Sequence, residues 1–361
     1  MTVHQEDQPI NNNSSPKDKK RGRKKIVSIL FFGFFLLLWA ILYLINREIL
    51  WRRIPDQAAN PQSVVVQIKH GSSLSDIAVA LSGQQLIRSQ TLFTTLAKLR
   101  GTSRHLKAGE YEFQRSMSLL DILLWLEEGR VILHKFTIPE GATVEQVAKL
   151  LSKKRLADSE EVLALARNKE FIQEMGVKST TLEGYLFPET YKIVRGLPAR
   201  QVVRIMVDRF WEVWKAESAN QADSQKIDID EIIKIASVIE KEAIYDEEEF
   251  LISSIIYNRL RRNMPLQCDV TIRYPLDNYG MNLTYADLRL DSPYNSYIYR
   301  GLPPTPICNP GRNAIRAALN PPKTDYLYFV SMNNGHHKFS TNLKDHNKAV
   351  YKYQILNHRG K

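Results

Sequence analysis

The feature that most constrains this chain is an uncharged apolar run near its start, IVSILFFGFFLLLWAILYLI, at residues 26–45. With a rise of about 1.5 Å per residue, a helix of this length crosses a hydrocarbon core of about 30 Å. The run is longer than the apolar core of a cleavable signal, and YLINRE at its end lacks a small-residue cleavage site. The sequence therefore predicts one uncleaved transmembrane helix.

Positive charge collects before this run. Residues 1–25 hold seven Lys or Arg and three acids in an Asn- and Ser-rich context, which is typical of a disordered tail. Because basic flanks stay inside, we expect a cytoplasmic N-terminus and export of everything from Asn46 onward. The net charge of +11 would suit nucleic acid, but an exported domain is not expected to meet it.

The two cysteines, Cys268 and Cys308, lie in the exported part, where oxidation is permitted. A disulfide between them remains open, because the sequence does not show whether their Cα atoms lie within bridging distance. Their spacing fits no zinc pattern.

After a stalk at residues 46–62, residues 63–155 are expected to form strand–helix repeats. VVVQIKHGSSLSDIAVALS at 64–82 aligns with HKFTIPEGATVEQVAKLLS at 134–152, and residues 108–129 repeat the theme more loosely. Each copy has β-formers, then a turn glycine, then a Ser or Thr at an N-cap position before an amphipathic helix. Such units resemble LysM modules, which bind glycans rich in N-acetylglucosamine; a purely structural role remains open.

Residues 156–225 are expected to form a helical connector that carries the aromatic motif LEGYLFPETY at 182–191. Tyr185 and Tyr191 would suit a sugar face, although aromatic residues this dense are more often core. The polar stretch ESANQADSQ at 217–225 is the best candidate boundary before a last domain at 226–361.

That last domain opens on a helix that ends in ASVIEKEA, at residues 236–243. On a helical wheel, Glu240 is flanked by the apolar residues Ile233 and Ile244, whereas Glu242 lies near Glu231 on a more polar edge. An apolar surround raises the pKa of a carboxyl and suits a general acid. The alternative is a helix-boundary glutamate paired with a lysine.

The segments downstream are rich in Tyr, Asn, Gln and Arg and in Pro-Gly turns. They contain no phosphate-binding glycine loop, no G-x-S-x-G and no H-E-x-x-H. Neutral donors and aromatic rings on rigid loops suit a polyhydroxylated ligand. Helical and strand-like segments alternate without a dinucleotide-binding fingerprint, which predicts an α+β fold with the glutamate helix buried inside.

The order of EGYLFPETY, ASVIEKEA, YNRL, PLQCDVT, SPYNSY, GLPPTPICNPG and TNLKDHN, behind one N-terminal span, resembles the MltG or YceG-like family of membrane-anchored endolytic murein transglycosylases. The resemblance implies cleavage of the bond between N-acetylmuramic acid and N-acetylglucosamine within peptidoglycan strands, with a role in ending strand elongation. It also implies a location in the bacterial inner membrane with the catalytic domain in the periplasm, and cell-wall synthases as partners.

Glu240 matches the family's catalytic glutamate, the first of its EKE motif, and Cys268 stands where the family usually has a small hydroxyl residue. In such a lyase the acid protonates the leaving oxygen, and the 6-hydroxyl of muramic acid closes a 1,6-anhydro ring, so neither a second carboxylate nor a cofactor is needed. We expect substrate contacts from residues on the motif loops: Tyr185, Tyr191, Tyr257, Asn258, Gln267, Asp269, Tyr294, Asn295 and Asn347.

Two other classes remain open. If Asp269 faces Glu240, the protein would be a two-carboxylate hydrolase of the same glycan. If Glu240 is ionised in a salt bridge, it would be a glycan-binding scaffold for wall-synthesis enzymes. His336, His337 and His346 invite a metal-site interpretation, but a vicinal pair and one distant histidine are more typical of loop packing, and no metal is expected.

Overall fold

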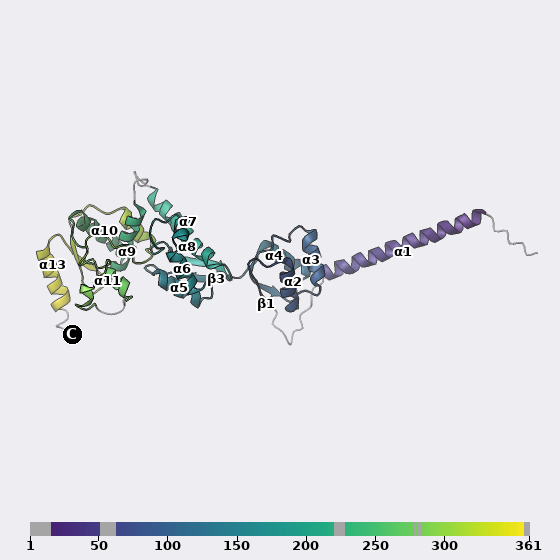
Figure 1. Cartoon of the computed structure of the whole chain (residues 1–361), viewed down its shortest axis with the longest axis horizontal. Coiled ribbons are helices and arrows are strands. Elements are labelled where there is room, and N and C mark those ends of the chain that lie inside the picture. Colours follow the sequence, from purple (N-terminus) through teal and green to yellow (C-terminus); the bar gives the residue numbers. More distant parts are fainter. Residues whose placement is uncertain (1–15, 51–62, 220–227, 278, 280–282, 357–361) are drawn as a thin grey trace, which may run out of the picture. The chain divides into compact units, whose positions relative to one another are not determined.

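The computed structural model describes residues 16–50, 63–219, 228–277, 279 and 283–356. The start of the predicted tail, most of the predicted stalk and most of the polar stretch 217–225 lie outside these residues. The chain divides into two compact units, residues 1–130 and 131–361. Figure 1 labels most of their helices and the strands β1 and β3.

Helix α1 (Pro16–Leu50) contains the predicted span. Its stretch Ser28–Arg47 has a mean hydropathy of 2.5, and none of it is buried. By length and composition this helix could cross a membrane, although a signal sequence near an N-terminus has the same properties.

The rest of the first unit is a small α+β body. It runs β1 (Ser63–Ile68), α2 (Leu74–Gly83), α3 (Gln90–Leu99), β2 (Gly109–Gln114) and α4 (Leu119–Glu128). The two strands pair antiparallel, and capping boxes begin α2 and α4. In each box a serine accepts a backbone hydrogen bond while an aspartate three residues later bonds back, which satisfies two free donors of the first turn.

The second unit begins with a strand pair and four helices. Its elements are β3 (Leu133–Thr137), α5 (Val144–Lys153), α6 (Ser159–Arg167), α7 (Lys169–Glu174), β4 (Thr190–Val194) and α8 (Ala199–Ser218). β3 and β4 pair antiparallel, with Leu133 opposite Val194. The motif LEGYLFPETY forms the turn before β4 and the first two residues of that strand.

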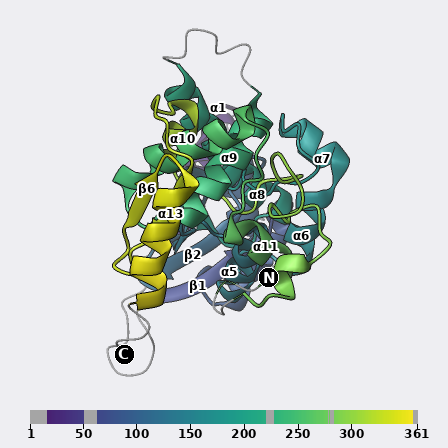
Figure 2. The ribbon, with the colours of Figure 1, turned by 90° about the vertical axis from the view of Figure 1, so that its left-hand side faces the viewer.

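The remainder of the second unit is mostly helical. It contains α9 (Ile229–Glu242), α10 (Asp246–Arg261), α11 (Asp269–Leu276), the short 3-10 helix η2 (Asp287–Arg289), α12 (Arg312–Leu319), the antiparallel pair β5 (Tyr328–Ser331) and β6 (His337–Ser340), α13 (Leu343–Val350) and a π-helical turn, η3 (Tyr351–Leu356). Helix α9 packs against α10, α11 and α12. Figure 2 shows α9 next to α10.

Helix α9 lies in the core of this unit, because its consecutive residues 235–239 are all buried. Asp228 caps its N-terminus by accepting the Asp230 N–H, and the chain leaves the helix at Ala243 in an extended conformation. Ile233, Ile235, Ala236, Ser237, Val238 and Ile239 are all buried. Each buried isoleucine contributes about 1.5–3 kcal/mol, so the helix is held in place up to its last turn, where Glu240 lies.

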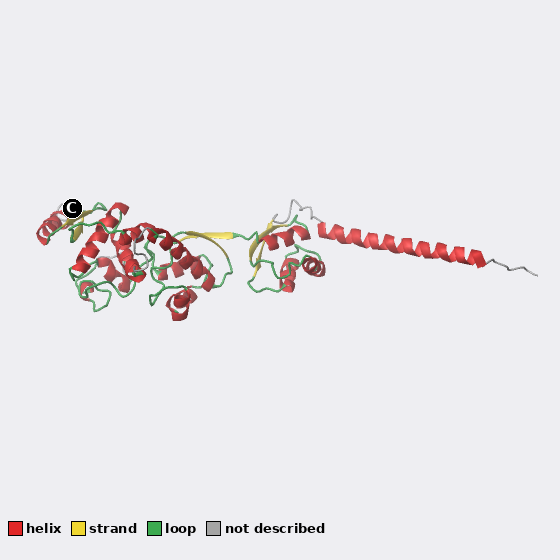
Figure 3. Ribbon diagram, turned by 90° about the horizontal axis from the view of Figure 1, so that it is seen from above, coloured by secondary structure: helices red, strands yellow, loops and turns green. Residues whose placement is uncertain are grey.

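The α+β prediction is confirmed: helices dominate, and the strands of the described residues occur only as short antiparallel pairs (Figure 3). Both strand–turn–helix copies form, with Gly71 and Gly141 at φ +80° and +72°. The structure groups them differently from the predicted 63–155 domain, because β3 and α5 belong to the second unit. β3 finds its partner strand at 190–194, beyond the predicted domain end.

Candidate active site

Glu240 lies half-buried in the last turn of α9. Its Oε2 atom accepts a hydrogen bond of 2.9 Å from the Gly311 N–H. Burial raises the pKa of Glu240 to about 7, the Gly311 bond and Lys241 oppose the shift, and Glu140 adds to it. At neutral pH this carboxyl is therefore present in both its acid and its carboxylate form.

Two loops come together at this carboxyl. Gly311 is the N-cap of α12, and a Cβ added there would overlap the Glu140 carboxyl, so the loop after β3 approaches α12 closely. A Cβ on Gly141 would lie 3.6 Å from the Glu240 Cγ and 3.6 Å from the Lys241 Nζ. The loop after β3 and the loop before α12 thus border the same side of Glu240.

Asn309 fastens these loops, although the sequence did not single it out. Its backbone exchanges hydrogen bonds with Gly141 and Ala142, and its Nδ2 donates to the Ala142 carbonyl. Its Oδ1 accepts from the N–H groups of Gly184 and Leu186 in the aromatic motif. Since this side chain is fully buried, it fixes three segments that are distant in sequence.

Glu242 differs from its prediction. It is half-buried, and burial together with the charge of Asp269 raises its pKa to about 7, while Cys268 and Arg273 oppose the shift. The sequence set Glu242 apart on a more polar edge, but burial raises the pKa of both acids. The helical wheel considered α9 alone, but α11 packs against the edge that carries Glu242.

Asp269 is exposed at the start of α11, and its Oδ1 accepts a 2.7 Å hydrogen bond from the Tyr297 hydroxyl. Its charge acts on Glu242. Asp269 is not among the groups that shift the pKa of Glu240.

Tyr185 and Tyr191, predicted to stack on sugar, are core residues. Tyr185 is 1% exposed, packs edge-on against Phe210 and bonds Asp230. Tyr191 stacks on Phe136 and donates to the Phe187 carbonyl. Their prediction as ligand-stacking rings is wrong, because both sides of the motif are covered by packing that the sequence did not reveal.

Four other residues predicted to contact substrate use their amides and hydroxyls in hydrogen bonds to loops of the protein. Asn258 and Asn295 are buried, and each donates twice to backbone carbonyls, at Thr324 and Tyr326 and at Leu288 and Leu290. Tyr257 donates to the Ala318 carbonyl, and the Tyr294 hydroxyl lies 2.8 Å from that of Thr305. Substrate contact stays a prediction for the half-buried Tyr257 and Tyr294, whereas the two asparagine side chains face protein.

Gln267 and Asn347 are exposed, as a ligand contact requires. Gln267 has φ +53°, and its Oε1 accepts a 3.3 Å bond from Arg259. Together with Asp269 it flanks the buried Cys268, whereas Asn347 lies on α13. Substrate contact stays a prediction for Gln267 and Asn347.

Two buried acids with a raised pKa were missed. Glu183, in the aromatic motif, accepts hydrogen bonds from the Val144 N–H and the Tyr274 hydroxyl, and burial raises its pKa to about 7. It borders a cavity of about 230 Å³. Glu249, in α10, is 7% exposed, and burial raises its pKa to about 8. No pattern pointed to Glu249, because it stands in an acidic run typical of an exposed helix start.

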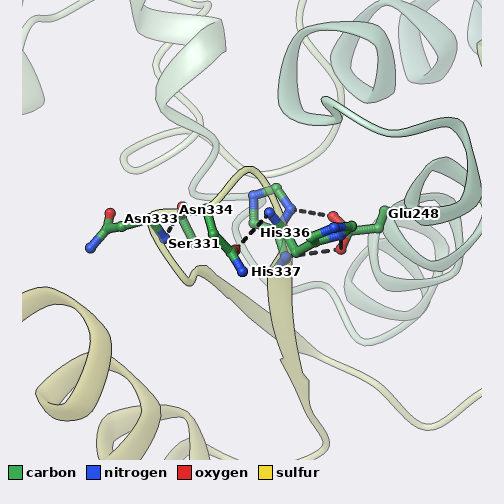
Figure 4. A network of polar contacts seen from close by, with 6 residues as sticks. All are labelled: Glu248, Ser331, Asn333, Asn334, His336 and His337. Atoms are coloured by element: carbon green, nitrogen blue, oxygen red, sulfur yellow. Dashed lines mark hydrogen bonds and ion pairs between the residues drawn. The ribbon is translucent and has the colours of Figure 1, made fainter.

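The histidines hold a hairpin. The Nδ1 atoms of His336 and His337 lie 3.2 and 2.7 Å from the Glu248 carboxylate, which also accepts the His337 N–H (Figure 4). The third, His346, stacks on Tyr328. Within the described residues no group of three or more His, Cys, Asp or Glu is placed to hold a metal ion.

The two cysteines do not form a disulfide in this structure. Cys268 and Cys308 are both free thiols. Cys308 donates to the Ser237 carbonyl at 3.3 Å, and Cys268 lies beside Glu242. Burial raises the pKa of both thiols.

Comparison with known proteins places this geometry in a family. The family model of the YceG-like family matches residues 66–352. The endolytic murein transglycosylase of Bacillus subtilis (strain 168) is 33% identical over 318 residues, which cover 83% of this chain and 87% of the relative. That of Streptococcus pneumoniae serotype 2 (strain D39) is 32% identical over 90% of this chain, which spans 65% of the relative's length.

A solved structure agrees. A YceG-like protein from Listeria monocytogenes is 35% identical, with a TM-score of 0.55 over 80% of this chain and 98% of its own. The family match includes Glu240, the loop that ends at Gly311, and both missed acids. The chain therefore belongs to the YceG-like family.

Proposed function

We propose that this protein is an endolytic murein transglycosylase, the activity for which the Bacillus and Streptococcus relatives are named. It cleaves the bond between N-acetylmuramic acid and N-acetylglucosamine inside a glycan strand and leaves a 1,6-anhydro end. The observation that carries the proposal is the half-buried Glu240, whose pKa is raised to about 7 by burial. A group with this acidity can both give and take a proton at neutral pH.

The reaction needs one carboxyl. Glu240 gives its proton to the glycosidic oxygen as the bond from that oxygen to C1 of muramic acid breaks. Positive charge develops at C1, the 6-hydroxyl of the same sugar attacks it, and the hydroxyl proton returns to the Glu240 carboxylate. One bond breaks, one forms, and no water is consumed.

The surroundings of Glu240 suit both halves of this cycle. Burial favours the acid that starts the reaction, and the Gly311 N–H, bound to Oε2, favours the carboxylate that follows proton donation. With Oε2 bound in this way, Oε1 is the oxygen available to carry the proton. No cofactor is needed for these steps.

The hydrolase alternative is less favoured, because Asp269, its expected second carboxyl, accepts a hydrogen bond from Tyr297 and acts on Glu242. An inverting hydrolase needs two carboxyls that flank one bond with room for water. The scaffold alternative needs an ionised Glu240, whereas burial favours its neutral form. Both readings therefore rank below the lyase.

Helix α1 would hold the enzyme at the membrane. Helix α1 spans the inner membrane with the basic tail in the cytoplasm, and the rest of the chain lies in the periplasm, where peptidoglycan is made. The β1–α2–α3–β2 body acts as a LysM-like glycan-binding module. Cleavage of new strands near the membrane would end their elongation beside the wall synthases.

Mass analysis of products tests the reaction class. Purified, uncrosslinked murein strands are incubated with the protein, and the masses of the fragments are measured by mass spectrometry. The proposal predicts anhydro ends; a hydrolase would give reducing ends that are heavier by one water, and a scaffold would leave the strands intact. Either of the last two results would overturn the proposed function.

A further inference from the structure

Lys241 directly follows the proposed catalytic glutamate, yet the reaction described above uses it in neither binding nor chemistry. Its side chain is half-buried in the last turn of α9. An ammonium has three hydrogen-bond donors, and burying it costs free energy unless it is paired. The contacts of this charge therefore show whether it serves the fold or a ligand.

The contact that the structure gives this ammonium is an aromatic ring. The Lys241 Nζ lies 4.3 Å from the centre of the Tyr279 ring. A ring face attracts a cation, but it leaves the directional N–H donors without a conventional acceptor. Within the described residues the ammonium forms neither an ion pair nor a hydrogen bond. Its donors are therefore available to a ligand.

The other lysine of α9 shows what a structural charge on this helix has as its partner. The Lys234 Nζ lies 2.6 Å from the Oδ2 of Asp230, four residues earlier on the helix. This spacing brings opposite charges together on a helix surface. The residue four positions before Lys241 is Ser237, which carries no charge. Helix α9 thus pairs one of its two lysines and leaves the second for a contact outside the helix.

Lys241 is close to Glu240 in space as well as in sequence. A Cβ added to Gly141 would lie 3.6 Å from the Lys241 Nζ and 3.6 Å from the Glu240 Cγ. The two side chains therefore border the same glycine, and these atoms lie no further apart than twice that distance. A substrate whose reacting bond lies against Glu240 also comes within reach of the ammonium.

The acids around this ammonium do not fully neutralise it. The charge of Lys241 acts on Glu240 and on Glu183, but burial still raises the pKa of each carboxyl to about 7. Both acids are therefore partly protonated at neutral pH. Glu183 already accepts hydrogen bonds from the Val144 N–H and the Tyr274 hydroxyl. An acceptor oxygen on the ligand would supply the partner that Lys241 lacks, through a charge-assisted hydrogen bond.

The proposed substrate carries such an oxygen near the reacting bond. N-acetylmuramic acid, whose C1 reacts, has a lactyl group on C3 that ends in an acyl group. This acyl group is a carboxylate on a peptide-free strand and an amide where a peptide is attached. In either form it offers an acceptor oxygen a few bond lengths from C1. N-acetylglucosamine has only a hydroxyl at C3, so an ammonium beside the acid can distinguish the two sugars.

We propose that the Lys241 ammonium donates a hydrogen bond to the acyl oxygen of this lactyl group, and so places N-acetylmuramic acid, rather than N-acetylglucosamine, with its C1 against Glu240. Lys241 is then a substrate-binding residue that determines which of the two glycosidic bonds is cleaved, and the Tyr279 ring restrains its side chain. This inference rests on the proposed function and names the group by which the strand is recognised.

The test measures kcat and KM of the full chain on two kinds of purified murein strand. One kind keeps its peptides, and an amidase has removed them from the other, which leaves lactyl carboxylates. Lys241→Met keeps an unbranched side chain and removes the charge. Its KM for peptide-free strands should rise about 10- to 100-fold, the effect of losing a hydrogen bond between charged groups. The rise for peptide-bearing strands should be smaller, because an amide oxygen carries no full charge.

The assay is run at pH 5.5 so that the titration of Glu240 does not enter. With its pKa of about 7, Glu240 is mostly protonated there, and loss of the neighbouring positive charge raises that pKa further. A lactyl carboxyl of ordinary acidity is ionised at this pH. The kcat of Lys241→Met should therefore stay within about threefold of the original value, because losing a contact made equally in the bound substrate and the transition state raises KM alone.

Two further variants serve as controls. Lys234→Met removes the paired lysine of the same helix and should leave KM for both strands unchanged, since its ammonium is already bound to Asp230. Lys241→Arg retains a positive charge and should restore most of the preference for peptide-free strands. The change in the ratio of the two KM values isolates the contact, because every other effect of the substitution is common to both strands.

The outcomes separate the two proposals. If Glu240→Gln, assayed alongside, still forms anhydro ends at the original rate, the proposed function fails. If Glu240→Gln is inactive but Lys241→Met keeps the original KM values, or Lys234→Met raises them equally, only the role of Lys241 is wrong. An equal rise for both strands would place Lys241 on another part of the glycan and would overturn the lactyl contact. Lys241→Gln is the second neutral variant, and failure of both to fold would show that the lysine serves the fold.

Discussion

The acidity of a single residue, Glu240, depends on neighbours that come from other parts of the chain. The Gly311 N–H stabilises its carboxylate, while burial and Glu140 favour its acid. Each pKa unit corresponds to a free-energy difference of about 1.4 kcal/mol between the acid and the carboxylate. A small movement of either loop therefore changes the fraction of Glu240 that is protonated.

Glu242 provides the sharpest comparison at this scale, because it has the same raised pKa of about 7 in the same helix turn. Glu242→Gln should lower the turnover by less than tenfold, since its carboxyl faces Cys268 and Asp269 and supports the contact between α9 and α11. Asp269→Asn should still give anhydro ends. Turnover and product mass for both variants check this prediction.

An inactive Glu242→Gln would move the chemistry to the α11 side of the helix. Loss of product formation in Asp269→Asn as well would indicate that Glu242 and Asp269 work as a pair, and so would favour the hydrolase. The Glu240→Gln variant in the same assay distinguishes damage to one edge of α9 from damage to the whole helix.

The burial of a single residue could be predicted only where its neighbours lie on its own helix. The wheel placed Glu240 beside Ile233 and Ile244, but α9 ends at Glu242 and Ile244 is 70% exposed, so this half-buried carboxyl has polar neighbours, Gly311 and Glu140, on its open side. It could not show the burial of Glu242 by α11, the core position of Tyr185 or the burial of Glu249. Those depend on which elements pack together, which is not encoded in a local pattern.

At the scale of elements, the aromatic motif and the loop before α12 are joined closely to α9. Gly184 has φ +92°, and a Cβ there would lie 2.7 Å from Ile233 of α9 and 2.7 Å from Pro306. The turn therefore needs glycine both for its backbone conformation and for the space. These contacts, with the bonds of Asn309, keep the loops around Glu240 in place.

Gly184→Ala should destabilise the protein more than Gly301→Ala does. Gly301 has nearly the same backbone angle, φ +91°, but nothing lies within 4 Å of its added Cβ. The control should therefore show only the backbone strain, about 1–2 kcal/mol, whereas Gly184→Ala adds about 1–3 kcal/mol of overpacking. Thermal melts compare the two; equal losses would show that the close packing at Gly184 is unimportant.

Elements were more predictable than their partners. The N-caps at Ser73 and Thr143 and the turn glycines after each strand follow from local chemistry, and the structure has them as expected. The pairing of β3 with β4, 53 residues apart at Thr137 and Thr190, does not, because strand partners are chosen by long-range packing. The same pairing accompanies the placing of β3 and α5 in the second compact unit, whereas the sequence grouped both copies at 63–155.

At the scale of the whole molecule, the chain combines an apolar helix with two folded units. If α1 is an uncleaved anchor, a reporter enzyme fused after Lys361 should be active only outside the cytoplasm, because the basic residues before the span stay inside. Parallel fusions to a periplasmic and a cytoplasmic reporter measure this. A C-terminal fusion active in the cytoplasm would contradict both the orientation and the access to peptidoglycan.

The most direct test of the account is the rate at which Glu240→Gln forms anhydro ends on purified murein strands. The amide keeps the shape of the side chain but can neither give nor recover the proton, so turnover should fall by about 10² to 10⁴. Folding should persist, since a neutral group in this half-buried site avoids the cost of a charge, and a normal melting curve checks it. Release of anhydro ends by folded Glu240→Gln at close to the original rate would contradict the central claim that this carboxyl performs the reaction.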